Sequence, residues 1–355
     1  MKTIFQYLLL LLLFTGSLFA DSNKGVTDLP DVSVIGNIMG VSTEDGSTFG
    51  IQEVEFAFQH YLYPNVKADI FTALHKEEDG TTAYELEEAY VTFFDTTSVF
   101  LPNYLNNFVF TTVVGKKLLN IGKINATHSD QWDFVDKPIA LEQFFGEEHG
   151  VVGEGIQVSY LLPTPFFSQL ELGGWTAPAH EESTSGDSHG VEYENRLFNS
   201  RLWNSFKVSD TNELQVGLNY LLGNATASSS DDQQSVVGID LTYTTEINNS
   251  NPVTLLAEYY SAKYGEEGED RESQSGGFVS GIYSVNKDYN AGIRYGYLGK
   301  HGDEGSTSSQ ISFMLTRQLT ETSKFRIQYN TGDNVTNTIS AQFLFGMGPH
   351  SHVLN

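Results

Sequence analysis

The stretch 289–297 reads Tyr-Asn-Ala-Gly-Ile-Arg-Tyr-Gly-Tyr, with apolar or aromatic residues at its odd positions and polar residues, Ala or Gly between them. Successive side chains of a β-strand point to opposite faces, so this period of two predicts a strand with one apolar and one water-facing side. The same alternation occurs at 214–220, 237–243, 325–329 and 339–343. Because a tilted strand of about 10 residues crosses a bilayer, these segments predict membrane-spanning strands.

Alternating segments recur along the whole chain, and their number indicates the fold. We expect strands near 32–40, 50–62, 64–75, 84–95, 110–121, 151–162, 167–177, 196–207, 212–222, 235–246, 252–263, 275–286, 288–299, 308–319, 323–331 and 336–346. A soluble β-sandwich could alternate similarly, but so many segments with Tyr and Phe at their ends favour a membrane barrel. We therefore predict an all-β fold, a transmembrane antiparallel β-barrel of about 16 strands, within a range of roughly 14 to 18.

The N-terminus and the composition fit export to the outer membrane. Residues 1–20 contain Lys2, an apolar run from Ile4 to Leu13 and a small residue at Ala20, which predicts a secretory signal peptide followed by the barrel at 21–355. The chain has no cysteine, which suits passage through an oxidising periplasm. Only 39% of its residues are hydrophobic, and we expect a membrane barrel to need an apolar outer surface but no apolar core.

The acidic excess predicts a preference for cations. The chain has a formal net charge of −26, and most of the excess falls in the longer connections, which we place at the outer mouth of the barrel. The alternative is that acidic loops only keep the exposed surface soluble. Both signs of charge occur at positions expected to face the lumen; those predicted as lumen charges are Glu88, Arg201, Asp240, Glu258, Arg294 and Arg326.

The longest connection, 122–149, is too long and too apolar to be a solvent-exposed external loop, and we expect it to fold inward and narrow the pore. Its acidic side chains would then form the pore constriction; they are Asp130, Asp133, Asp136, Glu142, Glu147 and Glu148.

Short motifs in this region resemble a family of Gram-negative outer-membrane proteins known as zinc-regulated outer-membrane receptors, which are similar to the phosphate-selective porins. The features that carry the resemblance are Gly115-Lys116, Gly122-Lys123 with Asn125 and His128, Asp136-Lys137-Pro138, Phe145-Gly146-Glu147-Glu148, Gly155 with Tyr160-Leu161-Leu162-Pro163, and the ending 343–350. The resemblance implies an outer-membrane channel linked to a divalent metal such as zinc.

Imidazole and carboxylate groups in the proposed external connections are candidate metal ligands, and His75 stands near them at a strand edge. Their spacing matches no defined zinc motif, so solvated loop histidines are the alternative, and we expect no cofactor beyond a weakly bound zinc ion. The candidate ligands are His128, His149, His180, Glu181, Glu182 and His189.

These observations predict a porin-like channel in the cell outer membrane, exported through the periplasm, for passive and cation-preferring diffusion of small hydrophilic solutes or metal ions. We expect outer-membrane lipid around the barrel, a homotrimer by analogy with porins, and no nucleic-acid partner. No spacing of Ser, His and Asp indicates an enzyme. The alternative function is a surface-exposed binding or adhesion barrel without conductance.

Overall fold

The computed structural model describes residues 29–76, 80–100, 108–146, 150–177, 193–224, 233–247, 251–264, 272–300 and 305–349. The described residues from Asp31 onward belong to one compact unit. The expected signal peptide at 1–20 lies outside the described residues and stays a prediction. Among the described residues, no helix is long and apolar enough to cross a membrane.

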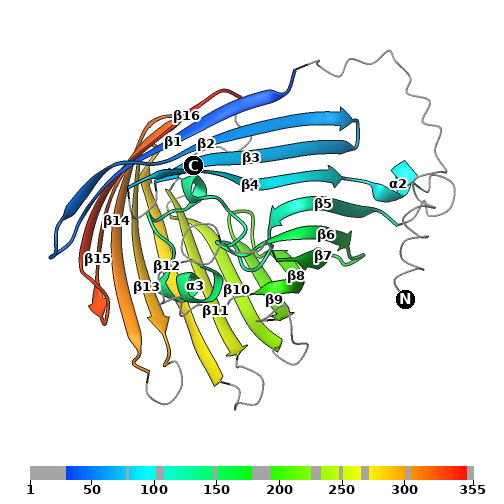
Figure 1. Ribbon diagram of the computed structural model, residues 1–355. Helices are drawn as coiled ribbons and strands as arrows, with labels where there is room; N and C mark the ends of the chain where they lie inside the picture. The colour runs from blue at the N-terminus through cyan, green and yellow to red at the C-terminus, as the bar shows by residue number, and fades with distance from the viewer. Residues whose placement is uncertain are drawn as a thin grey trace. The chain divides into compact units, whose positions relative to one another are not determined.

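Sixteen antiparallel strands form a closed barrel, in which each strand pairs with its neighbours in sequence and β1 pairs with β16 (Figure 1). The predicted fold class is confirmed. The strands are β1 (Asp31–Ser42), β2 (Ser47–Tyr63), β3 (Val66–Lys76), β4 (Thr82–Phe93), β5 (Phe110–Leu118), β6 (Val152–Leu161), β7 (Phe167–Thr176), β8 (Glu194–Lys207), β9 (Glu213–Asn224), β10 (Gln233–Ile247), β11 (Asn251–Tyr264), β12 (Glu272–Asn286), β13 (Tyr289–Leu298), β14 (Ser308–Thr320), β15 (Ser323–Asp333) and β16 (Thr338–Met347).

The alternation of side chains between the two faces of the sheet explains the barrel. Asp240 on β10 is fully buried inside, whereas its neighbours Ile239 and Leu241 are each 39% exposed on the outer surface. Outward apolar side chains suit lipid, and a charge placed there at mid-membrane would cost about 2–4 kcal/mol. All six predicted lumen charges lie on the inner face, with exposures of 0–7%.

One connection of the barrel contains a short helix. The stretch 96–109 is long for a turn, and its first part forms α2 (Thr96–Phe100). The carboxylate of Asp95 accepts hydrogen bonds from the Thr97 hydroxyl and the Ser98 backbone N–H, and so caps the start of this helix.

The connection between β5 and β6, residues 119–151, folds into the barrel, as predicted; we call it the inserted segment. It contains a 3-10 helix, η1 (Ser129–Gln131), and α3 (Ile139–Phe145), which contacts β12 and β13 (Figure 1). Its apolar side chains join inward-facing residues of β7 to β12 in a buried cluster that includes Leu141, Phe144 and Tyr260. The expectation that the barrel needs no apolar core is therefore wrong, because the inserted segment brings apolar surface into the lumen and buries it there.

Candidate functional site

The base of the inserted segment is closed by one buried amide. The Asn125 side chain donates a hydrogen bond to the Leu119 carbonyl (2.8 Å) and accepts one from the Val151 backbone N–H (2.9 Å). Leu119 also donates its N–H to the Val151 carbonyl (2.9 Å). Asn125 thus ties together the two ends of the segment, next to the strands that it connects.

Beside this base, the segment is anchored to the wall formed by β9 and β11. The Gly122 N–H donates to Asn219 Oδ1 (3.0 Å), and the Lys123 N–H donates to Glu258 Oε1 (2.8 Å). Gly122 has a φ of +65°, and a Cβ there would collide with the Tyr260 hydroxyl and the Glu258 carboxylate. A glycine is needed here both for the backbone conformation and for the close approach to the wall.

Cationic side chains of β15 hold the middle of the segment through its backbone carbonyls. Arg326 donates to the carbonyls of Trp132 (2.7 Å) and Phe134 (2.9 Å), and Lys324 donates to the carbonyl of Asp130 (2.8 Å). Such charge-assisted hydrogen bonds are stronger than neutral ones. Arg326, predicted as a lumen charge, therefore fixes the path of the segment across the lumen.

Asp136 makes the most polar anchor of the segment. Its carboxylate forms an ion pair with Arg294 of β13 and accepts hydrogen bonds from Gln328 (2.7 Å) and Asn330 (2.6 Å) of β15. Arg294 is only 2% exposed, so this pair is largely withdrawn from water. The next residues, Lys137 and Pro138, lead directly into α3.

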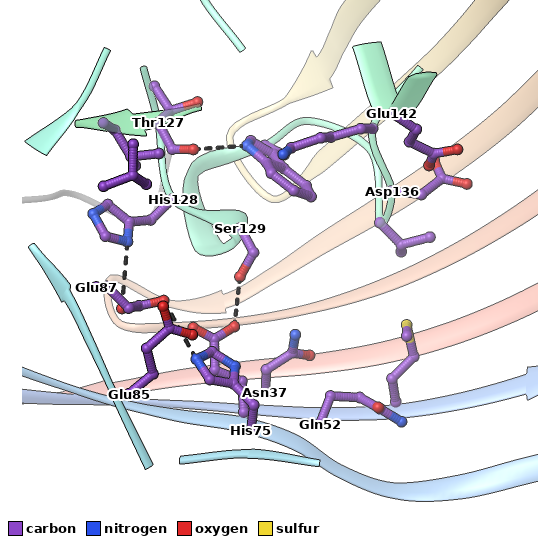
Figure 2. Close-up of a pocket in the computed structure, with 17 residues that line it drawn as sticks. Asn37, Gln52, His75, Glu85, Glu87, Thr127, His128, Ser129, Asp136 and Glu142 are labelled. Carbon is purple, nitrogen blue, oxygen red and sulfur yellow. Dashed lines mark hydrogen bonds and ion pairs between the residues drawn. The ribbon is translucent and has the colours of Figure 1, made fainter. Parts of the chain in front are cut away.

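A cavity of about 330 Å³ remains on the opposite side of the lumen, between the inserted segment and strands β1 to β6. Its lining contains five carboxylates, two histidines and one lysine; these are Glu53, Glu85, Glu87, Asp136, Glu142, His75, His128 and Lys137. In Figure 2, His75, Glu87, His128 and Ser129 converge on one part of the cavity, while Asp136 and Glu142 lie apart from them. The cavity wall is therefore predominantly acidic.

An irregularity in β4 gives this wall its density of carboxylates. The pairing of β3 with β4 shifts between Phe71 and Thr72, which face Glu88 and Leu86, so that Glu87 is the extra residue of a β-bulge. Both Glu87 (6% exposed) and Glu88 (3%) consequently lie inside the barrel, although they are adjacent in sequence. Regular alternation would have placed one of them against lipid.

His128 links the inserted segment to this wall. Its Nδ1 lies 3.1 Å from the Glu55 carboxylate, and its Nε2 lies 3.0 Å from that of Glu88. Burial lowers the pKa of His128, but the hydrogen bonds and negative charges of Glu55 and Glu88 outweigh it and raise this pKa well above its usual range. A doubly protonated imidazolium, donating from both nitrogens to two carboxylates, is the state that this geometry stabilises.

The predicted constriction residues do not act as one group. Asp136 and Glu142 line the cavity. Asp130 is buried and Asp133 is exposed, and neither lines the cavity, because the backbone between them is turned toward β15 by Lys324 and Arg326. Glu147 and Glu148 lie outside the described residues.

Among the predicted metal ligands, only His128 lies within the described part of the chain. It was expected at the external mouth, but it lies inside the barrel, because the described part of the inserted segment folds into the lumen. The remaining candidates, His149, His180, Glu181, Glu182 and His189, fall in the ranges that the structure does not describe.

Among the described residues, two groups of potential ligands occur inside the barrel instead: Glu53 with His75 and Glu87, all of which line the cavity, and Glu55 with Glu87 and His128. Glu53, Glu55 and Glu87 were missed as candidate ligands. The signal for Glu87 is present in the sequence, since outward apolar residues fall at even positions up to Leu86 and at odd positions from Ala89 onward.

Comparisons with known proteins agree with the barrel. No protein-family model matches the chain. An uncharacterised protein of Aquifex aeolicus (strain VF5) is 25% identical over 334 residues, covering 82% of this chain and 67% of that protein.

Solved structures of outer-membrane proteins are similar to the chain over most of its length. OmpT of Vibrio cholerae, folded in vitro and in trimer form, matches with a TM-score of 0.55 and 11% identity, covering 90% of this chain and 100% of that one. The outer-membrane channel DcaP of Acinetobacter baumannii matches with a TM-score of 0.57 and 12% identity, covering 91% of this chain and 99% of that one. Salmonella typhi OmpF, solved with daunomycin, matches with a TM-score of 0.55 and 11% identity, covering 90% of this chain and 97% of that one. The chain therefore has the closed β-barrel fold of the outer-membrane porins.

Proposed function

We propose that the protein is an outer-membrane channel for passive, cation-preferring diffusion, and that its passage follows the cavity between the inserted segment and β1 to β6. The observation that carries the proposal is the asymmetry of the lumen. The apolar cluster joins the segment to β7 to β12, whereas the acidic cavity lies on the other side. The structures of porins and of an outer-membrane channel that share the fold support a pore as the use of this barrel.

The lining of the cavity supports the cation preference. Five carboxylates in this lining outnumber one lysine and the His128 imidazolium, and this excess creates a negative local potential, which concentrates cations and repels anions in a narrow passage. Glu85 and Glu142 lie on opposite walls, one on β4 and the other on α3. Small hydrophilic cations are therefore the solutes that we assign to the channel, with zinc or another divalent metal as the narrower assignment suggested by the family resemblance. We propose a homotrimeric assembly, as in the trimer form of OmpT.

Current across a planar bilayer tests the channel. Refolded protein under a salt gradient should give steady single-channel steps with a reversal potential of the cation-selective sign. Glu85→Gln combined with Glu142→Gln should move that potential toward zero. Glu321→Gln, in the exposed turn between β14 and β15, is the matched control and should leave it unchanged. An anion-selective or unselective wild-type pore would contradict the cation preference.

One observation favours the second candidate, a surface-binding barrel without conductance. The inserted segment brings a buried apolar cluster into the lumen and is held by several strands, which is the arrangement of a plugged barrel. Absence of current from protein that has demonstrably folded, judged by heat-modifiable mobility in a gel, would establish this reading and refute the channel.

A further inference from the structure

We propose that Glu53, His75 and Glu87 form a binding site for a divalent transition-metal ion of the zinc class on the wall of the cavity. A role of this site in transport rests on the proposed channel function, whereas metal binding itself does not. The argument uses the placement of three side chains on neighbouring strands, the distances between them and the neighbouring groups that orient them.

The sheet brings the three side chains together on the inner face of three neighbouring strands. Glu53 of β2 and His75 of β3 are directly paired across the two strands, a position that places Cβ atoms about 4.5–5.5 Å apart. The β4 bulge turns Glu87 inward beside them. One ligand atom from each residue lies within 4.8 Å of the others, and all three residues line the cavity.

The spacing fits ligands of one ion better than a hydrogen bond. His75 Nε2 and Glu87 Oε1 are 3.5 Å apart, which is longer than the usual N–H···O distance of about 2.7–3.2 Å. Two ligands at about 2.0–2.1 Å from a tetrahedral zinc ion stand about 3.3 Å from each other. Both side chains are nine-tenths buried, so the geometry is held by the barrel wall (Figure 2).

The donor set selects the class of metal. One imidazole with two carboxylates suits zinc and its transition-metal neighbours, whereas calcium and magnesium prefer oxygen ligands alone. Three protein ligands leave a fourth coordination position for a water molecule from the cavity, as in zinc sites with an exchangeable ligand. Because all three ligands line the cavity, the ion would reach the site through the cavity.

The inserted segment orients the site without occupying it. The Ser129 hydroxyl donates to Glu53 Oε2 (2.8 Å), an outer hydrogen bond of the kind that fixes a ligating carboxylate. His128 belongs to the neighbouring group with Glu55 and Glu87: its Nδ1 lies 3.1 Å from Glu55 and 3.8 Å from Glu87 Oε2, and its Nε2 lies 3.0 Å from Glu88. Both ring nitrogens are thus already paired with carboxylates. The site is therefore assigned to His75, and His128 is assigned to positioning Ser129 beside Glu53.

Titration calorimetry of the refolded protein in detergent with zinc chloride, and cobalt(II) absorption, test the site. We expect the visible bands of four-coordinate cobalt and a binding step that excess magnesium does not displace. His75→Gln and Glu87→Gln should each weaken that step about 100-fold or more, since loss of even an outer-sphere partner costs about 10–100-fold. His60→Gln, which changes another strand histidine outside the cavity lining, is the matched control. Gel mobility shows that each variant folds.

Two outcomes overturn the proposal. If zinc binds equally to wild type, His75→Gln and Glu87→Gln, the ion is held elsewhere, for instance by loop histidines; if zinc does not bind to folded wild type, the site does not exist. Bilayer currents separate these results from the channel proposal. Current without zinc binding would contradict only the metal site, and zinc binding without current would contradict only the channel. Zinc block of the wild-type current that is lost in His75→Gln would support both proposals.

Discussion

Asp136→Ala should release the inserted segment from the barrel wall. The substitution removes the ion pair with Arg294 and two hydrogen bonds, from Gln328 and Asn330, and leaves the guanidinium of Arg294 buried without its carboxylate. Removing one partner of a buried pair costs about 3–5 kcal/mol. The Asp136 side chain is 28% exposed, so water offsets part of this loss and we expect about 3 kcal/mol, at the lower end of that range.

A loss of about 3 kcal/mol raises the population of the detached segment on the order of 100-fold. The neighbouring Trp132 is 7% exposed, so detachment should increase quenching of tryptophan emission by iodide. In a bilayer, the same variant should show larger or more frequently fluctuating single-channel currents. Asp45→Ala, which removes an exposed carboxylate from the turn between β1 and β2, is the control. Quenching and currents identical to those of wild type and Asp45→Ala would refute the anchoring role of Asp136.

Three further substitutions test the packing of the barrel and its contents. Gly122→Ala forces a methyl group against Tyr260 at a positive φ and should destabilise the anchored segment, measured as increased proteolysis within it. Asn125→Asp keeps the acceptor for Val151 but loses the hydrogen bond to Leu119, and should lower the unfolding free energy in urea by about 1–3 kcal/mol. Ile293→Lys puts a charge on the lipid face and should make folding into vesicles less favourable by about 2–4 kcal/mol.

Controls for these variants come from the same barrel. Gly174→Ala adds a methyl group with nothing within 4 Å and should leave proteolysis unchanged. Leu319→Lys replaces an outward apolar residue near the end of β14, where the charge costs about 0–1 kcal/mol. If Gly122→Ala behaved like Gly174→Ala, the close approach to Tyr260 would be unimportant. Equal costs for Ile293→Lys and Leu319→Lys would contradict the assignment of the lipid face.

The strands were predictable because their signal is local. In the stretch around Arg294, each residue's own polarity decides which face of the sheet it occupies, and no distant contact is needed to read that pattern. The number of such segments then predicted an antiparallel barrel, which the pairing of β1 with β16 closes. The inward path of 122–149 was also predictable, because its apolar residues could not remain exposed in an external loop.

The contents of the lumen were not predictable in the same way. Asp136 meets Asn330 across 194 positions of sequence, and Lys123 meets Glu258 across 135. Such pairings depend on barrel closure and on the strand register, which the polarity of single residues does not encode. The bulge at Glu87 has the further effect of turning two adjacent carboxylates to one side, against the regular period.

The sequence by itself determined the strands, their lipid-facing side and the inward charges on the regular strands, because each depends only on a period of two along single strands. The tertiary structure alone decided that the lumen is divided between an apolar core and an acidic cavity. It also decided which carboxylates and histidines meet there, because these groups come from strands and a segment far apart in sequence. His128 shows the difference, since its residue type predicted metal binding at the mouth, whereas its position inside the barrel makes it a bridge between Glu55 and Glu88.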